Sequence, residues 1–180
     1  TKMIRKGAFV VGHNRAATRG TVKDENAHPF WVDDKIVLVQ NGTYKGSHKH
    51  HKDTEVDTEA IAHVIAENDN VAEALSTVNA AFALVWYNAE TKVLHLIRNS
   101  ERPLWLVRLE SDAYVFASEL ETIYWATTKA GIKVKTSEQL DPHTMYAFDL
   151  SHNTVTFSRT KIASEYNFRL GKAQQDDDDN

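Results

Sequence analysis

The stretch AAFALVWYN, residues 80–88, is apolar at consecutive positions rather than at every second one. A strand with one face in water alternates apolar and polar residues, whereas a strand covered on both faces is apolar throughout. KIVLVQ, residues 35–40, has the same character. We therefore expect a sheet that is buried on both faces, with a further layer of structure packed against each side.

Several other segments carry β-branched and aromatic residues between turn residues, which is the pattern of β-strands. Their close succession predicts a mixed α and β domain with much antiparallel hairpin pairing. The further expected strands are residues 7–15, 92–99, 104–109, 113–118, 145–150 and 154–157.

Two segments have the apolar period of an amphipathic helix. The first spans about residues 57–68. The second spans residues 118–128 and opens with Ser118 and Glu121, which have the spacing of a capping box. Residues 71–81 are a third and weaker candidate. Helices of this kind would supply the layers that cover a sheet on its two faces.

The composition is that of a water-soluble globular domain. Of the 180 residues, 42% are hydrophobic and 26% are charged, and no apolar run approaches the roughly 20 residues that cross a bilayer. The start of the chain also lacks the pattern of a secretory signal. We therefore expect a cytoplasmic protein with no membrane partner.

The net charge of −4 equals the charge of Asp176–Asp179 in the terminal QQDDDDN, so the rest of the chain is close to neutral. We expect this acidic tail to be disordered and solubilising. A neutral body lacks the positive surface of a nucleic-acid binder, so we expect no nucleic-acid partner. The chain contains no cysteine, which excludes disulfides, thiolate metal sites and thiol catalysis by these residues alone.

Four polar phrases follow the expected strands or open the first helix. Taken singly, each has an ordinary structural explanation: Asn41-Gly42 is typical of a hairpin turn, and Asp57 suits the first turn of a helix. The phrases are GHNRAATRG (12–20), NAHPF (26–30), QNGTY (40–44) and EVDTEAIAH (55–63).

In this order and spacing, the four phrases resemble those of the class II glutamine amidotransferases. This N-terminal-nucleophile family includes glucosamine-6-phosphate synthase and amidophosphoribosyltransferase. The similarity covers most of residues 7–157. It implies an α+β fold, a four-layer αββα sandwich, that here lacks the first strand and the helices after it. We expect residues 1–160 to form this glutamine amidotransferase domain, incomplete at its N-terminus, and residues 161–180 to be a C-terminal extension.

The resemblance gives each phrase a role in glutamine binding. A glutamine site must recognise an α-carboxylate and an α-ammonium group before the side-chain amide is attacked. Arg15 has the two-pronged guanidinium that suits a carboxylate, and Thr18 would complete that grip. Asp57 would bind the ammonium group. The implied substrate is therefore free glutamine.

Asn41 and Gly42 are the catalytic candidates. The resemblance implies that the Asn41 side-chain amide and the Gly42 N–H form an oxyanion hole for the tetrahedral intermediate. Glycine allows a substrate to approach the backbone closely. The family needs no cofactor and no metal ion for this hydrolysis, so we expect neither.

The family's nucleophile is an N-terminal cysteine, and this chain has none. Three explanations stay open: the cysteine lies in an upstream segment of a longer gene product, the protein is a glutamine-binding or scaffolding pseudoenzyme, or Thr1 is the nucleophile. We favour the first. Because nothing after residue 157 resembles a sugar isomerase, a phosphoribosyl site or an ATP-binding synthetase, we expect a separate protein or chain to accept the ammonia.

The sequence departs from the family at Gln40, where the family commonly has a histidine. The chain's own histidines have less specific interpretations. His13 and His28 are expected to pack among the motifs rather than to act as catalytic bases. The loop with His48, His50 and His51 could bind a divalent metal, but a solvated loop is the preferred interpretation.

Overall fold

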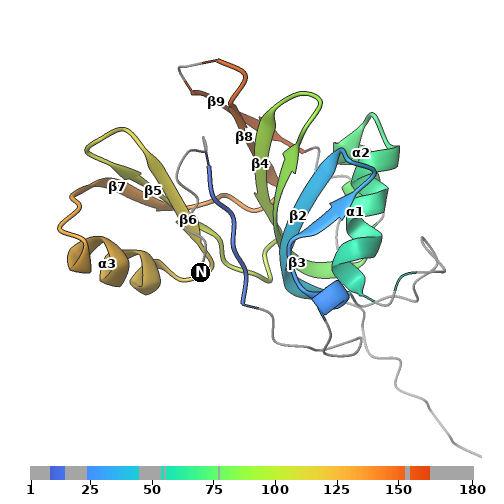
Figure 1. Cartoon of the computed structure of the whole chain (residues 1–180), viewed down its shortest axis with the longest axis horizontal. Helices are drawn as coiled ribbons and strands as arrows, with labels where there is room; N and C mark the ends of the chain where they lie inside the picture. Colours follow the sequence, from blue (N-terminus) through green and yellow to red (C-terminus); the bar gives the residue numbers. More distant parts are fainter. Residues whose placement is uncertain are drawn as a thin grey trace, which may run out of the picture.

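The computed structural model describes residues 9–14, 24–44, 54, 56–76, 78–152 and 155–162. Within these residues two antiparallel sheets and three α-helices build the fold (Figure 1). None of the described helices has the length and apolar character needed to span a bilayer.

The larger sheet has the strand order β1-β2-β3-β4-β8-β9. Its longest strands are β2 (Ile36–Tyr44) and β3 (Ala80–Asn88), which pair along their whole length. The remaining strands are β1 (Phe30–Val32), β4 (Val93–Arg98), β8 (Thr144–Asp149) and β9 (Thr156–Lys161).

The smaller sheet has the order β6-β5-β7. It consists of β5 (Trp105–Leu109), β6 (Tyr114–Ala117) and β7 (Val134–Gln139). The helices are α1 (Asp57–Glu67), α2 (Val71–Ser76) and α3 (Leu120–Lys129), and a 3-10 turn spans Asp24–Asn26.

The elements form four layers, as the family resemblance implies, and the apolar strands of the larger sheet are covered on both faces, as their sequences predict. On β3, Leu84 and Trp86 face α1 and α2 in one core, whereas Ala83 and Val85 face the smaller sheet in a second core. A third core lies between the smaller sheet and α3, where Ile123 is buried. Figure 1 shows α1 and α2 on one side of the molecule and α3 on the other. The successive apolar residues of β3 are therefore divided between two cores.

Residues 9–14 differ from the sequence prediction, because they belong to neither sheet. Phe9 and Val11 pack against the core between the sheets, and the ring centroids of Phe9 and Tyr87 lie 4.7 Å apart. Val10 between them is 62% exposed. The apolar residues that suggested a strand here are used to cover the core by side-chain packing.

The boundaries of two predicted helices are also corrected. Glu119, not Ser118, is the N-cap of α3, and it makes no side-chain cap hydrogen bond. The expected capping box therefore does not form, and the helix is held by burial of Ile123 against the smaller sheet. The helix predicted over residues 71–81 ends at Ser76, because Ala80 and Ala81 pair with β2 as the start of β3.

His95 on β4 stacks on Trp86 with ring centroids 4.7 Å apart and an interplanar angle of 12°. Burial lowers the pKa of His95 from 6.5 to about 4. Since the unfolded chain takes up this proton near pH 6.5 and the folded chain only near pH 4, His95 lowers the stability as the pH falls through that window.

We predict that His95→Gln weakens this acid sensitivity. In urea titrations, the free energy of unfolding should fall by about 2 kcal/mol less in the variant than in wild type between pH 7 and pH 4.5. Above both pKa values of His95, between pH 7 and about pH 8.5, the two proteins should show the same pH dependence, which serves as the control. Equal pH dependence of the two proteins between pH 7 and pH 4.5 would contradict the prediction.

Candidate functional site

One residue from each of the four polar phrases meets in a single line of contacts. The ring centroids of His13 and His28 lie 4.3 Å apart. His28 Nε2 lies 2.8 Å from Thr58 Oγ1, and Thr58 Oγ1 donates to Gln40 Oε1 at 2.9 Å. Residues far apart in the sequence are thus brought to one place between α1 and β2, and we call these four residues the polar line.

The polar line is buried at its centre, where Gln40 and Thr58 are each 3% exposed. The Thr58 hydroxyl has one proton, with which it donates a hydrogen bond to Gln40 Oε1. Its oxygen therefore accepts the hydrogen bond from His28 Nε2. Buried polar groups cost free energy unless they are hydrogen-bonded. The line therefore fixes the first turn of α1 against β2.

Asp57 lies next to Thr58 in the first turn of α1 and is 5% exposed. The helix N-terminus carries a partial positive charge, which favours a carboxylate at this position. Asn41 follows Gln40 on β2 and is half-buried. Since Thr58 and Gln40 are hydrogen-bonded, the structure brings the segments that contain Asp57 and Asn41 together.

Gly42 stands where no side chain fits. A Cβ atom there would lie 2.0 Å from the Ala81 carbonyl oxygen, 2.9 Å from Gln40 Nε2 and 2.9 Å from Phe82 Cα. The Asn-Gly pair is not a hairpin turn, because both residues lie within β2 and pair with β3. Glycine at this position allows the close approach of two backbones.

The ladder also fixes the direction of the Gly42 N–H. Phe82 faces Gly42 across the ladder, but its N–H and C=O bond to Asn99 on the opposite side. In an antiparallel pair, residues that do not bond each other point their amides away from each other. The Gly42 N–H therefore points away from β3, towards the edge where β1 pairs only with Ile36–Leu38.

Arg15 and Thr18 lie outside the described residues, as do His48, His50 and His51. His13, two positions before Arg15 in the sequence, contacts His28 at the polar line. The packing of His13 and His28 among the motifs agrees with the interpretation from sequence. Sequence reasoning missed the link from Thr58 to Gln40, since it reveals the phrases but not which side chains touch.

The family comparison agrees with this arrangement. Residues 13–124 match the family model described as a glutamine amidotransferase domain. This match covers more than half of the chain and includes all four phrases except Gly12, the first residue of the first phrase. The protein belongs to the glutamine amidotransferase domain family, of the class II, N-terminal-nucleophile type.

Two relatives have the same name, glutamine--fructose-6-phosphate aminotransferase [isomerizing]. The protein of Thermococcus kodakarensis is 36% identical over 140 residues, which are 66% of this chain and 23% of the relative. The protein of Thermus thermophilus is 34% identical over 96 residues, which are 44% of this chain and 16% of the relative. The matched region thus spans less than a quarter of either relative's length.

Solved structures share the fold. A glutamine phosphoribosylpyrophosphate amidotransferase from B. subtilis superposes with a TM-score of 0.61 at 22% identity, over 84% of this chain and 34% of that one. A structure described as the allosteric regulatory enzyme of purine biosynthesis gives a TM-score of 0.57 at 21% identity, over 77% and 32%. The four-layer α+β sandwich is therefore the fold of this chain.

We predict that Gly42→Ala destabilises the protein by at least about 3 kcal/mol, because the added methyl group meets the Ala81 backbone at 2.0 Å. Chemical denaturation measures the loss. Gly12→Ala is the control, since a Cβ atom at Gly12 meets nothing within 4 Å. Equal stability of the two variants would show that β2 can move away from β3 at this point.

The polar line makes a prediction of its own. Thr58→Val should cost about 2 kcal/mol of folding free energy, because it leaves the Gln40 carbonyl buried without its donor. Removing both partners costs less than removing one. Adding Gln40→Met to Thr58→Val should therefore recover part of the loss, as measured in a double-mutant cycle. Additive losses would show that the two side chains do not interact.

Proposed function

We propose that this domain binds free glutamine and hydrolyses its side-chain amide to glutamate and ammonia. The observation that carries the proposal is the polar line, in which one residue from each of the four phrases meets between α1 and β2. Such a meeting is expected if the phrases build one site. It brings the helix that begins at Asp57 to the strand that holds Asn41 and Gly42.

The substrate would be held at its amino-acid end by opposite charges. Arg15 would bind the α-carboxylate through two parallel hydrogen bonds, with Thr18 as a further donor. Asp57 would bind the α-ammonium group. Its burial supports this role, since a carboxylate shielded from water attracts a cation more strongly than an exposed one. Together the two charges would select free glutamine over an isolated amide.

The amide oxygen would become negative in the tetrahedral intermediate. The Asn41 side-chain N–H and the Gly42 N–H would donate to it, and each such donor contributes about 3 kcal/mol to lowering the barrier. The direction of the Gly42 N–H supports this role, because the N–H is not used between β2 and β3. The lack of room for a side chain at this position holds the Gly42 backbone close to Ala81 and Phe82, which fixes where its N–H lies.

The nucleophile would be a cysteine outside these 180 residues, which contain none. Its thiolate would attack the glutamine amide carbon, and the C–N bond would break as the nitrogen takes a proton and leaves as ammonia. Water would then cleave the thioester to give glutamate and restore the thiol. The cysteine's α-amine, with an ordinary pKa near 8, would serve as the base.

We propose residues 1–160 as the extent of the amidotransferase domain and a further module or separate protein as the ammonia acceptor. The two relatives described above are named as aminotransferases of fructose-6-phosphate, and this chain matches less than a quarter of each. Their remaining length is large enough for an acceptor domain. The identity of the substrate that accepts the ammonia would be determined by that acceptor module, and not by the residues described above.

A second candidate function is glutamine binding without hydrolysis. The proposed binding residues Arg15, Thr18 and Asp57 need no nucleophile, so they are compatible with either function. The two functions are separated by the full-length gene product: its intact mass and N-terminal sequence, ammonia release from glutamine, and covalent labelling by an electrophilic glutamine analogue. Hydrolysis requires ammonia and a labelled cysteine. Glutamine binding with neither would establish the second function, and no binding would exclude both.

We predict that Asp57→Asn and Arg15→Ala each weaken glutamine binding more than about 30-fold in calorimetry, because each removes a charge partner of the amino acid. Glu59→Gln is the matched control for Asp57→Asn, since Glu59 is the other acidic residue in the first turn of α1. It should bind glutamine as wild type does. Unchanged glutamine affinity in Asp57→Asn would show that Asp57 does not bind the substrate.

A further inference from the structure

Asn99 continues the β3–β4 ladder with its side chain. β4 ends at Arg98, and the Asn99 N–H still donates to the Phe82 carbonyl at 3.0 Å. The return bond is made by the side chain, because the Phe82 N–H donates to Asn99 Oδ1 at 3.2 Å. Asn99 Nδ2 then donates to the Ala80 carbonyl at 2.8 Å. One carboxamide thus holds the first three residues of β3.

Asn99 is itself fixed in place. It is 2% exposed, and its Oδ1 also accepts the Glu101 N–H at 3.1 Å, which turns the chain away from the sheet. The Asn99 carbonyl accepts Arg98 Nη1 at 3.1 Å. Arg98 Nε donates to the Leu140 carbonyl at 2.5 Å, so the guanidinium ties this turn to the end of β7 in the other sheet.

The Arg98 guanidinium has no carboxylate partner among the described residues and is 9% exposed. Backbone carbonyls of Leu140, Asn99 and Arg102 surround it. A buried cation held only by carbonyl dipoles keeps those carbonyls in fixed positions, since losing any one of them leaves part of the charge unsolvated. The turn after β4 is therefore a rigid support.

The turn after β4 is connected to the proposed oxyanion donors, Asn41 and Gly42, through β3. Ala80, Ala81 and Phe82 are register partners of Tyr44, Thr43 and Gly42. The Ala81 carbonyl and Phe82 Cα also occupy the space beside Gly42. Asn41, Ala83 and Arg98 form one row across the sheet. A shift at the start of β3 would therefore move Asn41 and Gly42 directly.

We propose that Asn99, held by Arg98, is a positioning residue that sets the place of the Asn41 and Gly42 donors. The inference rests on the proposed glutamine hydrolysis at that site. Oxyanion donors act on the transition state more than on bound substrate, so displacing them lowers kcat and leaves KM nearly unchanged. Loss of Arg15 or Asp57 would instead weaken binding.

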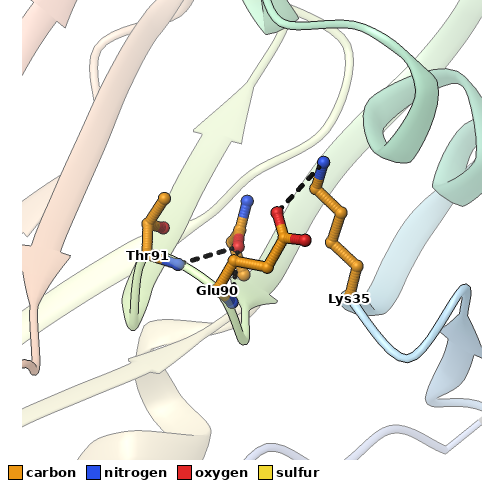
Figure 2. Close-up of polar contacts among 4 residues, drawn as sticks. Lys35, Glu90 and Thr91 are labelled. Carbon is orange, nitrogen blue, oxygen red and sulfur yellow. Dashed lines mark hydrogen bonds and ion pairs between the residues drawn. The ribbon is translucent and has the colours of Figure 1, made fainter.

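The hairpin offers a matched control at its other end. Asn88 Oδ1 accepts the Glu90 N–H at 2.9 Å and the Thr91 N–H at 3.1 Å, so it holds the β3–β4 turn as Asn99 holds the start of β3. Figure 2 shows this turn with its ion pair between Lys35 Nζ and Glu90 Oε2 at 3.2 Å. Asn88 pairs with Ile36, six positions before Gly42 on β2.

The test compares Asn99→Ala with Asn88→Ala in the full-length gene product. We expect Asn99→Ala to lower kcat for glutamine hydrolysis at least about 10-fold with KM within about 3-fold, and Asn88→Ala to leave both within about 2-fold. If Asn99→Ala does not fold, Asn99→Asp serves instead, since it keeps the acceptor for the Phe82 N–H, loses the donor to Ala80 and adds a negative charge beside the Arg98 guanidinium.

A second measurement tests whether Asn99 holds Asn41 in place, and it does not depend on enzymatic activity. Amide hydrogen exchange at Asn41, which lies in the β2–β3 ladder, should be at least about 10-fold faster in the Asn99 variant than in Asn88→Ala. Equal exchange, or an unchanged kcat, would overturn the inference. A wild-type protein that releases no ammonia would refute the proposed hydrolysis, and the exchange measurement would still decide whether Asn99 positions Asn41.

Discussion

The pairing of β2 with β3 is the constraint on which the rest of the structure depends. The two strands run side by side over nine register pairs, and their side chains divide between the helical layer and the smaller sheet. Because both faces are buried, a slip of one residue would exchange the contents of two cores at once. The register therefore has one solution, and Asn41, Gly42 and Ala83 take their places from it.

The polar line is the exception within this apolar packing. Gln40 lies on the helix-facing side of β2, where Leu38 and Ile36 are fully buried. Its Oε1 accepts a hydrogen bond from Thr58 on α1, while its Nε2 is buried without a partner among the described residues. A buried hydrogen bond of this kind contributes little net stability, but a mismatch is costly. Its main effect is to make one relative position of α1 and β2 much better than the others.

Sequence reasoning reached the layered fold because burial on both faces leaves a direct mark on composition. It reached the family because four phrases in a fixed order are improbable by chance. It failed where the outcome depends on distant packing: β7, with the polar sequence VKTSEQ, is a strand only because β5 lies beside it. The capping box predicted at Ser118 does not form, because α3 begins after Glu119 and is held by the burial of Ile123. The role of Asn99 requires knowing where β3 begins, which no local pattern gives.

The extended conformation of Asn41 and Gly42 has a consequence for the working life of the protein. In a flexible loop an Asn-Gly pair ages chemically, because the glycine nitrogen attacks the asparagine side chain and the amide is lost as ammonia. Strand β2 holds the two groups apart and ties Asn41 into the ladder. Conversion of Asn41 to a carboxylate would place a negative charge beside the proposed oxyanion site. The rate at which strand β2 opens would therefore set how long each molecule stays able to hydrolyse glutamine.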